Sequence, residues 1–253
     1  MSTPASLEAG TVETTLADGV GTVRFGHPKS NSLPGALLTR LAGAITQLGA
    51  DGAVRVIVLQ SDGTGPFCAG ASFDEFRAVH SAEDGKRFFA GFAHVILAMI
   101  RAPKFVLTRV QGKSAGGGVG LIAAADYALA VTGADIKLSE LSVGIGPFVV
   151  GPVIEKKLGL AAFSALAVDA DWRSAAWAEQ HGLYAEVLDN LTALDARVRD
   201  CAANLAGYNP EAMQLLKEAF WTGTEDWPEL LSRRAELSGR LVLSEYTRDA
   251  IGS

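Results

Sequence analysis

The chain has 253 residues, of which 49% are hydrophobic and 20% charged, and this is the composition of a folded globular protein rather than a disordered one. A net charge of −6 without any run of lysine or arginine argues against nucleic acid or an anionic membrane as a partner. Two cysteines are too few for a disulfide framework, and we expect no metal site. Without a membrane-length apolar run or a secretory signal in residues 1–10, we expect a soluble, cytoplasmic protein.

The first half of the chain alternates between strand and helix patterns. Residues 11–16 and 20–26 alternate in polarity around an Asp-Gly pair, which predicts a β-hairpin. Apolar residues at helical spacing predict a helix over 37–48, and the apolar run 54–59 predicts a strand covered on both faces. Further elements of both kinds are expected in this order: helix 81–100, strand 105–110, helix 115–124, and strands 127–131 and 136–138. This alternation predicts an α/β core with parallel strands.

From about residue 150 the strand patterns fade, and only residues 184–188 still favour an extended chain. Helical segments are expected at 150–158, 160–168, 173–181, 192–206, 210–220 and 226–247. We therefore expect a core domain over residues 1–190 and a helical region over 191–253. Apolar helix faces in such a region often form contacts between subunits.

Two glycine-rich loops, Gly65–Ala71 and Gly112–Gly120, are the most informative feature of the sequence. Each follows a predicted strand and leads into a predicted helix, so both can direct main-chain N–H groups at one point. The helix after the second loop adds the positive end of its dipole. Such a pair of turns suits a thioester oxygen that carries negative charge. Cys68, within the first loop, is expected to be a small buried residue beside a tight turn rather than a nucleophile.

A competing interpretation of the second loop is a serine hydrolase. The stretch Gly112–Gly116 matches the G-x-S-x-G nucleophile elbow, with Ser114 as the nucleophile. The only downstream histidine is His181, preceded by Asp169 and Asp171 as possible acids. His181 lies at a typical helix C-terminus, where a histidine usually caps the helix.

Four short motifs stand in a fixed order between about residues 11 and 190. They are His27-Pro28-x-x-Asn31-Ser32-Leu33, Phe67-Cys68-Ala69-Gly70-Ala71, Val110-Gln111-Gly112-x-x-Ala115-Gly116-Gly117-Gly118 with Ala124-Ala125-Asp126, and Leu138-Ser139-Glu140-Leu141-x-x-Gly144. Together they resemble the enoyl-CoA hydratase/isomerase (crotonase) family. The resemblance implies an α/β fold, a crotonase-like spiral of stacked ββα turns with a helical C-terminal layer. It also implies a homotrimer or a dimer of trimers that acts on acyl-CoA thioesters.

The resemblance also implies roles for individual residues. The main-chain N–H groups of Ala69 and Gly117 would form the oxyanion hole, and Glu140 would be the catalytic acid and base. Apolar neighbours of Glu140 should raise its pKa toward neutrality. The residues implied to contact CoA lie near the same loops: Lys29, Ala69, Gly70, Ala71, Ser72 and Gly117.

One departure from the family pattern concerns the reaction. Family hydratases commonly carry a second glutamate where this chain has Gly120. We expect an enzyme of fatty acid metabolism that hydrates or dehydrates enoyl-CoA through an enolate, with CoA arriving in the substrate and no other cofactor. The alternatives are a Δ3-Δ2-enoyl-CoA isomerase using a single glutamate, the serine hydrolase, and a non-catalytic acyl-CoA-binding protein. Acyl specificity is expected to depend on how residues 73–100 and 144–165 cover the site.

Overall fold

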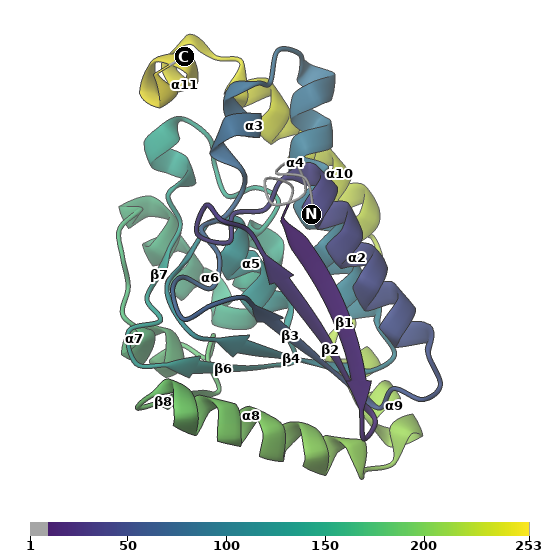
Figure 1. The fold of residues 1–253 in the computed structure, drawn as a ribbon. Helices are drawn as coiled ribbons and strands as arrows, with labels where there is room; N and C mark the ends of the chain where they lie inside the picture. Colours follow the sequence, from purple (N-terminus) through teal and green to yellow (C-terminus); the bar gives the residue numbers. More distant parts are fainter. Residues whose placement is uncertain (1–9, 253) are drawn as a thin grey trace, which may run out of the picture.

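The computed structural model describes residues 10–252, so the expectation about a secretory signal in residues 1–10 falls almost wholly outside the described residues. Figure 1 shows one twisted main sheet, and a second sheet of only two short strands lies beside it. The main sheet has the order β1 (Thr11–Ala17), β2 (Val20–Gly26), β3 (Val56–Ser61), β4 (Phe105–Val110), β6 (Tyr127–Val131) and β8 (Glu186–Leu188), and the small sheet pairs β5 (Ser114–Ala115) with β7 (Ile136–Lys137). β1 and β2 form the predicted antiparallel hairpin, and every other pairing is parallel.

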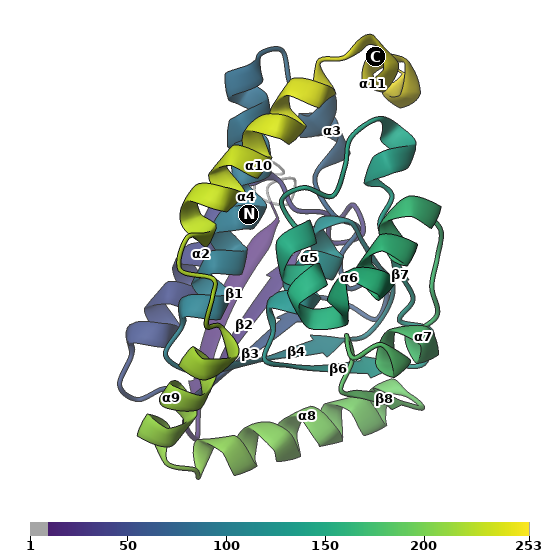
Figure 2. The same ribbon diagram turned by 180° about the vertical axis from the view of Figure 1, so that it is seen from behind.

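The helices form layers around this sheet. Their bounds are α2 (Gly35–Ala50), α3 (Phe73–Arg77), α4 (Ala82–Arg101), α5 (Gly117–Ala124), α6 (Gly151–Asp169), α7 (Ala175–Gln180), α8 (Leu191–Ala206), α9 (Pro210–Phe220), α10 (Trp227–Val242) and α11 (Glu245–Ile251). Helix α4 packs against both α2 and α10, and α5 packs against α4 and α6. Figure 2 shows α10 running along this group and α8 lying beneath the strands of the main sheet, against which it packs. The C-terminal helix α11 lies beside α3 in both views.

Most predicted elements are present, and the differences have local causes. Helix α6 contains a kink at Gly159 (φ 78°), which agrees with the two separate segments predicted there. The prediction of one continuous helix over 226–247 is wrong, because α10 ends at Val242 and Ser244 caps a new helix by accepting a hydrogen bond from the Thr247 N–H. The short helix α3 was not predicted.

The two glycine-rich loops leave the same edge of the sheet. Strands β3 and β4 are buried and run parallel, so their carboxyl ends, followed by the two loops, lie side by side. At this edge the Gln111 side-chain N–H donates to Ser61 Oγ at 2.7 Å and joins the two strand ends. This topology brings together loops that are about 45 residues apart in the sequence.

The C-terminal helices share the core of the sheet domain. Leu194 and Val198 of α8 and Leu231 of α10 belong to the same hydrophobic cluster as Val58 of β3. The division at residue 190 coincides with the start of α8, whose first turn is capped by Asn190. The assignment of two domains stays a prediction.

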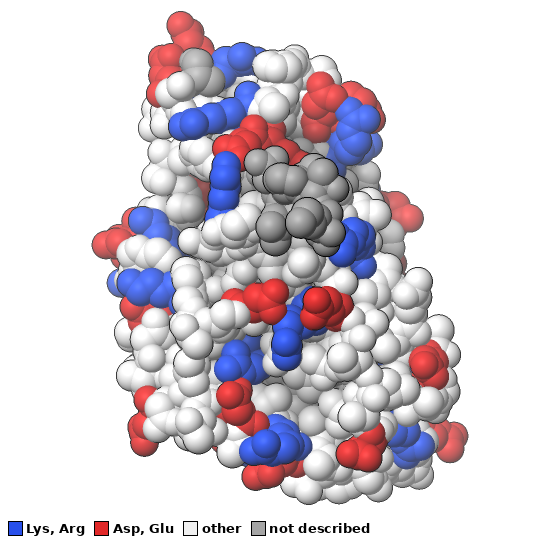
Figure 3. Space-filling view, viewed as in Figure 1, with Lys and Arg blue, Asp and Glu red and all other residues white. Residues whose placement is uncertain are grey.

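The surface shows no dominant charge on the face drawn in Figure 3, where basic and acidic side chains are interspersed. No helix between residues 10 and 252 is both long and apolar enough to cross a membrane.

Candidate active site

The first glycine-rich loop is clamped between two other segments. On one side Cys68 and Ser114 form a parallel bridge, and the Ala115 N–H donates to the Cys68 carbonyl oxygen at 2.9 Å. On the other side Leu33 forms a parallel bridge with Ala71. The N–H and the carbonyl oxygen of Leu33 form hydrogen bonds with the two sequence neighbours of Ala71, not with Ala71 itself. In such a bridge the N–H of Ala71 itself faces away from Leu33. The clamp therefore directs this N–H toward the second loop.

Hydrogen bonding distinguishes Ala71 from Ala69. The Ala69 N–H donates to the Ser30 carbonyl oxygen at 3.1 Å, so the structure does not support its predicted role as an oxyanion donor. The Ala71 N–H has no acceptor among residues 10–252, and Ala71 lines the pocket described below. Gly70 explains why the N–H groups of Ala69 and Ala71 differ in their partners. Its φ of +88° breaks the regular alternation of an extended chain between these two residues. The sequence motif locates the loop but does not show this reversal.

The second loop carries Gly117, the other residue predicted to be an oxyanion donor. Gly116 has φ 51° and ψ −118°, a conformation that favours glycine, and helix α5 starts directly after it at Gly117. As the first residue of the helix, Gly117 has an N–H without an intrahelical partner, and none of the described residues accepts from it. A Cβ atom placed on Gly70 would lie 3.7 Å from the Gly117 nitrogen, which shows how closely the two loops meet.

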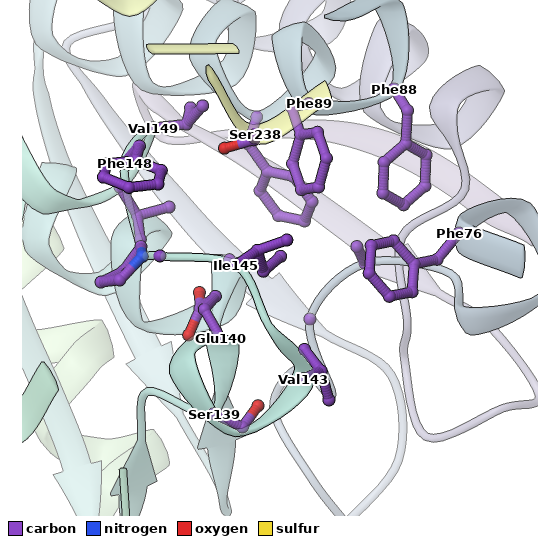
Figure 4. Close-up of a pocket in the computed structure, with 18 of the residues that line it drawn as sticks. Phe76, Phe88, Phe89, Ser139, Glu140, Val143, Ile145, Phe148, Val149 and Ser238 are labelled. Atoms are coloured by element: carbon purple, nitrogen blue, oxygen red, sulfur yellow. The ribbon is translucent and has the colours of Figure 1, made fainter. Parts of the chain in front are cut away.

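Glu140 lies next to these donors. It begins a single 3-10 turn over Glu140–Val143, and its carboxylate lies beside Gly116, where a Cβ would be 3.1 Å from Oε1. Its other oxygen, Oε2, is buried and has no hydrogen-bond partner among the described residues. Burial raises the pKa of Glu140 to about 7. Figure 4 shows the carboxyl group pointing into the pocket, with Ile145 above it.

Apolar side chains form the remaining walls of this pocket. They come from α3, α4 and the segment 143–150 and include Phe76, Phe88, Phe89, Phe92, Val143, Ile145 and Phe148. Helix α10 adds the polar Ser238. In Figure 4 the rings of Phe76, Phe88 and Phe89 gather on one side, across from Glu140. An apolar wall beside one carboxylate and two free main-chain donors is the arrangement that proton transfer next to a carbonyl requires.

Val150 fills the space at Gly120. A Cβ atom on Gly120 would lie 2.5 Å from Cγ1 of Val150, so no side chain fits there without a shift of α6. Glu140 is the only ionisable residue among the described residues that line the pocket. The site therefore offers one carboxylate rather than two.

Two of the residues predicted to contact CoA already have partners in the protein. The exposed Lys29 forms an ion pair with Asp74. Ser72 is buried, and its Oγ accepts from the Glu75 N–H at 3.4 Å as the N-cap of α3. The Ser-x-x-Glu spacing is a capping signal that could have predicted α3. Contacts of Lys29 and Ser72 with CoA stay predictions.

The first motif has a structural role that the sequence did not reveal. The buried Asn31 donates through Nδ2 to the carbonyl oxygens of Asp62 and Pro66, both at 2.9 Å, and accepts from the His27 N–H at 3.0 Å. These bonds attach the 27–33 loop to the first glycine-rich loop. The motif thereby fixes residues 27–33, which contain the hydrogen-bond partner of Ala69 and the bridge partner of Ala71.

The geometry contradicts the serine hydrolase interpretation. Ser114 Oγ is buried without a hydrogen-bond partner among residues 10–252, so no histidine can act on it as a base. His181 instead stacks on Trp177, with ring centroids 4.0 Å apart, at the end of α7. The expectation for Cys68 is confirmed, because its thiol is fully buried and this raises its pKa to about 12.

Comparison with known proteins gives a consistent picture. A family model described as enoyl-CoA hydratase/isomerase matches residues 15–242. The chain is 32% identical over 199 residues to the mitochondrial methylglutaconyl-CoA hydratase of Rattus norvegicus, a match that covers 77% of this chain and 63% of that protein. An enoyl-CoA hydratase from Bacillus halodurans, 20% identical, shares the fold with a TM-score of 0.88 over 95% of this chain and 98% of the other. An enoyl-CoA hydratase from Mycobacterium smegmatis, 29% identical, has a TM-score of 0.80 over 90% and 88%.

Proposed function

Since the chain belongs to the enoyl-CoA hydratase/isomerase family, as its four motifs predicted, we propose that it adds water to, or removes it from, an enoyl-CoA thioester. The observation that carries this proposal is the Glu140 carboxylate, which lies beside Gly116 and whose buried Oε2 has no hydrogen-bond partner among the described residues. The N–H groups of Ala71 and Gly117, for which residues 10–252 provide no acceptor, would hold the thioester oxygen. Ala71 takes the role that the sequence motif suggested for Ala69.

In the proposed hydration Glu140 acts first as a base and then as an acid. Its carboxylate takes a proton from water, the resulting hydroxide bonds to the β-carbon, and the electron pair of the double bond moves to the thioester oxygen. The two N–H donors stabilise this enolate. Each donor lowers the activation free energy by about 3 kcal/mol, by comparison with the deletion of single oxyanion-hole donors. Glu140 then returns its proton to the α-carbon, and the carboxylate is restored. A pKa of about 7 suits both steps near neutral pH.

A second candidate, double-bond isomerisation, is favoured by the contact between Gly120 and Val150. This contact leaves no room for a second carboxylate to position water. In a 3-enoyl thioester, Glu140 would take a proton from the α-carbon, the enolate would form on the same donors, and the proton would return at the γ-carbon. One carboxylate is sufficient for this shuttle.

The proposal extends to the rest of the substrate and to assembly. CoA enters as part of the thioester, Lys29 would meet its phosphates, and the chemistry uses only groups of the protein and the substrate. The exposed apolar side chains of Leu215, Leu216 and Phe220 on α9 support a homotrimer or dimer of trimers built through the C-terminal helices. We also propose that the protein acts in fatty acid metabolism and is located in the cytoplasm.

Crotonyl-CoA and a 3-enoyl-CoA, assayed in parallel, test the proposed function. Loss of the conjugated enoyl absorbance from crotonyl-CoA would support hydration, and gain of that absorbance from the 3-enoyl-CoA would support isomerisation. If neither changes over a range of acyl chains while acyl-CoA still binds, the alternative of a non-catalytic acyl-CoA-binding protein would replace both.

A further inference from the structure

We propose that the acyl group bound in this pocket is compact, uncharged and aromatic. This proposal names the substrate class of the site and rests on the proposed function, in which the substrate is a CoA thioester. The pocket walls, rather than the catalytic residues, carry this inference. Three properties of the walls point to it: the absence of a cation, the arrangement of the phenyl rings, and the closure of the far end.

The first property is charge. The described residues that line the pocket include no lysine, arginine or histidine, and Glu140 is their only ionisable member. A carboxylate on the acyl group would lose its hydration without gaining a cationic partner, and it would face the Glu140 carboxylate. The pocket therefore disfavours dicarboxylic acyl groups, although the relative from Rattus norvegicus is named for methylglutaconyl-CoA.

The second property is the aromatic wall. Phe88 and Phe89 meet edge to face with ring centroids 5.0 Å apart, and Phe76 and Phe89 meet edge to face at 6.2 Å. Figure 4 shows the half-buried Phe89 ring extending into the pocket between Phe88 and Ser238. Edge-to-face and offset contacts are the preferred arrangements of phenyl rings, so an aryl group would join this cluster with favourable geometry on more than one side.

The third property is closure. Phe76 and Phe88 also belong to a separate hydrophobic cluster that includes Val79, Val242 and Ile251. Val79 follows α3, Val242 ends α10 and Ile251 ends α11, and together they pack behind the two rings. The Arg77 Nε–H of α3 donates to the Ile251 carbonyl oxygen of α11 at 3.1 Å. A long straight acyl chain would have to open this cluster, whereas a single ring would not.

The test measures dissociation constants for four saturated thioesters that cannot react: 3-phenylpropanoyl-CoA, butanoyl-CoA, glutaryl-CoA and decanoyl-CoA. We expect 3-phenylpropanoyl-CoA to bind about tenfold more tightly than butanoyl-CoA. Glutaryl-CoA should bind at least about tenfold more weakly than butanoyl-CoA. Decanoyl-CoA should bind no more tightly than 3-phenylpropanoyl-CoA.

Two variants locate the preference. Phe89→Leu should reduce the advantage of the phenyl thioester to about twofold while butanoyl-CoA binding changes little. The control Tyr208→Leu removes an exposed ring from the turn between α8 and α9, outside the pocket, and should leave all four constants unchanged. Thermal unfolding of both variants checks that each is folded.

The inference is overturned if glutaryl-CoA binds as tightly as butanoyl-CoA, if decanoyl-CoA binds more tightly than 3-phenylpropanoyl-CoA, or if the wild type shows no phenyl preference. It is also overturned if Phe89→Leu keeps the full phenyl preference. Failure of all four thioesters to bind would overturn it together with the proposed function. The expected order of binding without turnover of any enoyl-CoA would overturn the proposed reaction alone.

Discussion

The carboxylate of Glu140 lies beside Gly116, close enough that a Cβ atom at position 116 would be 3.1 Å from its Oε1. Gly116 is the residue directly before Gly117, whose N–H is the proposed oxyanion donor. The proposed base and one of its two electrostatic partners are therefore held in fixed relation by a single turn of backbone.

Gly116→Ala should disturb both stability and catalysis. The φ of 51° with ψ of −118° is unfavourable for alanine, and the new methyl group would press on the carboxylate. We expect a loss of about 2 kcal/mol in the free energy of unfolding. Urea unfolding measures this loss, and steady-state kinetics should show a lower kcat. A variant with wild-type stability and kcat would show that this contact is unimportant.

Glu140→Gln should make the protein more stable at alkaline pH. The pKa of Glu140 is raised from 4.5 to about 7, so raising the pH between these values ionises the residue first in the unfolded chain and destabilises the wild type. Glutamine removes this effect, and the variant should gain up to about 3 kcal/mol above pH 7 and nearly nothing at pH 4. Urea unfolding at pH 4 and pH 8 tests the sign. Equal stability of the two proteins at pH 8 would show that the carboxylate is not desolvated.

Ala71→Pro and Ala69→Pro should separate the two candidate donors. Proline removes an N–H group. The Ala71 N–H has no acceptor within residues 10–252, whereas the Ala69 N–H donates to the Ser30 carbonyl oxygen. Ala71→Pro should lower kcat by about 100-fold or more. Ala69→Pro should mainly lower stability, by about 1 kcal/mol for the lost hydrogen bond plus any strain.

An infrared measurement makes this comparison independent of activity. Hydrogen bonds to the carbonyl oxygen of a bound thioester lower its stretching frequency, and an isotopic label identifies the band. The shift should weaken in Ala71→Pro and persist in Ala69→Pro. The opposite pattern would restore Ala69 as the donor.

Asp74→Asn and Lys29→Ala should change CoA binding in opposite directions. In the free protein Lys29 is paired with Asp74, and this ammonium group lowers the pKa of the Asp74 carboxyl. Asp74→Asn releases Lys29 for a CoA phosphate and should tighten binding by up to about fivefold, while Lys29→Ala should weaken it by a similar factor. Both effects should shrink as salt is added. Titration of CoA at two ionic strengths measures them, and no effect of Lys29→Ala would remove this residue from the binding site.

Elements with long periodic patterns could be predicted from the sequence. The strand Val56–Ser61 and the helix Ala82–Arg101 bury regular apolar patterns, and parallel pairing then brings the two glycine-rich loops to one edge. The family resemblance and the crotonase-like α/β fold followed from the four sequence motifs, and the family match and the structural likenesses confirm them. The catalytic roles of Glu140 and Gly117 stay predictions, although the structure places Glu140 beside the second loop.

Features that depend on single dihedral angles or on long-range packing could not be predicted in this way. The reversal at Gly70 decides which N–H of the first loop is free, and no spacing in the sequence encodes it. Val150 closes the space at Gly120 from 30 residues away, and only the packing of α6 on α5 shows this. The aromatic wall required α3, whose capping signal at Ser72 is short and easily overlooked.

The proposed role of Glu140 as acid and base is tested by measuring the kinetics and the ligand binding of Glu140→Gln together. We expect kcat toward the best enoyl-CoA to fall by about 1000-fold, because the amide can neither accept nor return the proton. The dissociation constant of butanoyl-CoA should stay within about threefold of the wild type, since the main-chain donors remain. In the wild type kcat/KM should rise with pH up to about 7 and then level off. A variant that keeps the wild-type kcat and still binds butanoyl-CoA would show that Glu140 is not the catalytic acid and base.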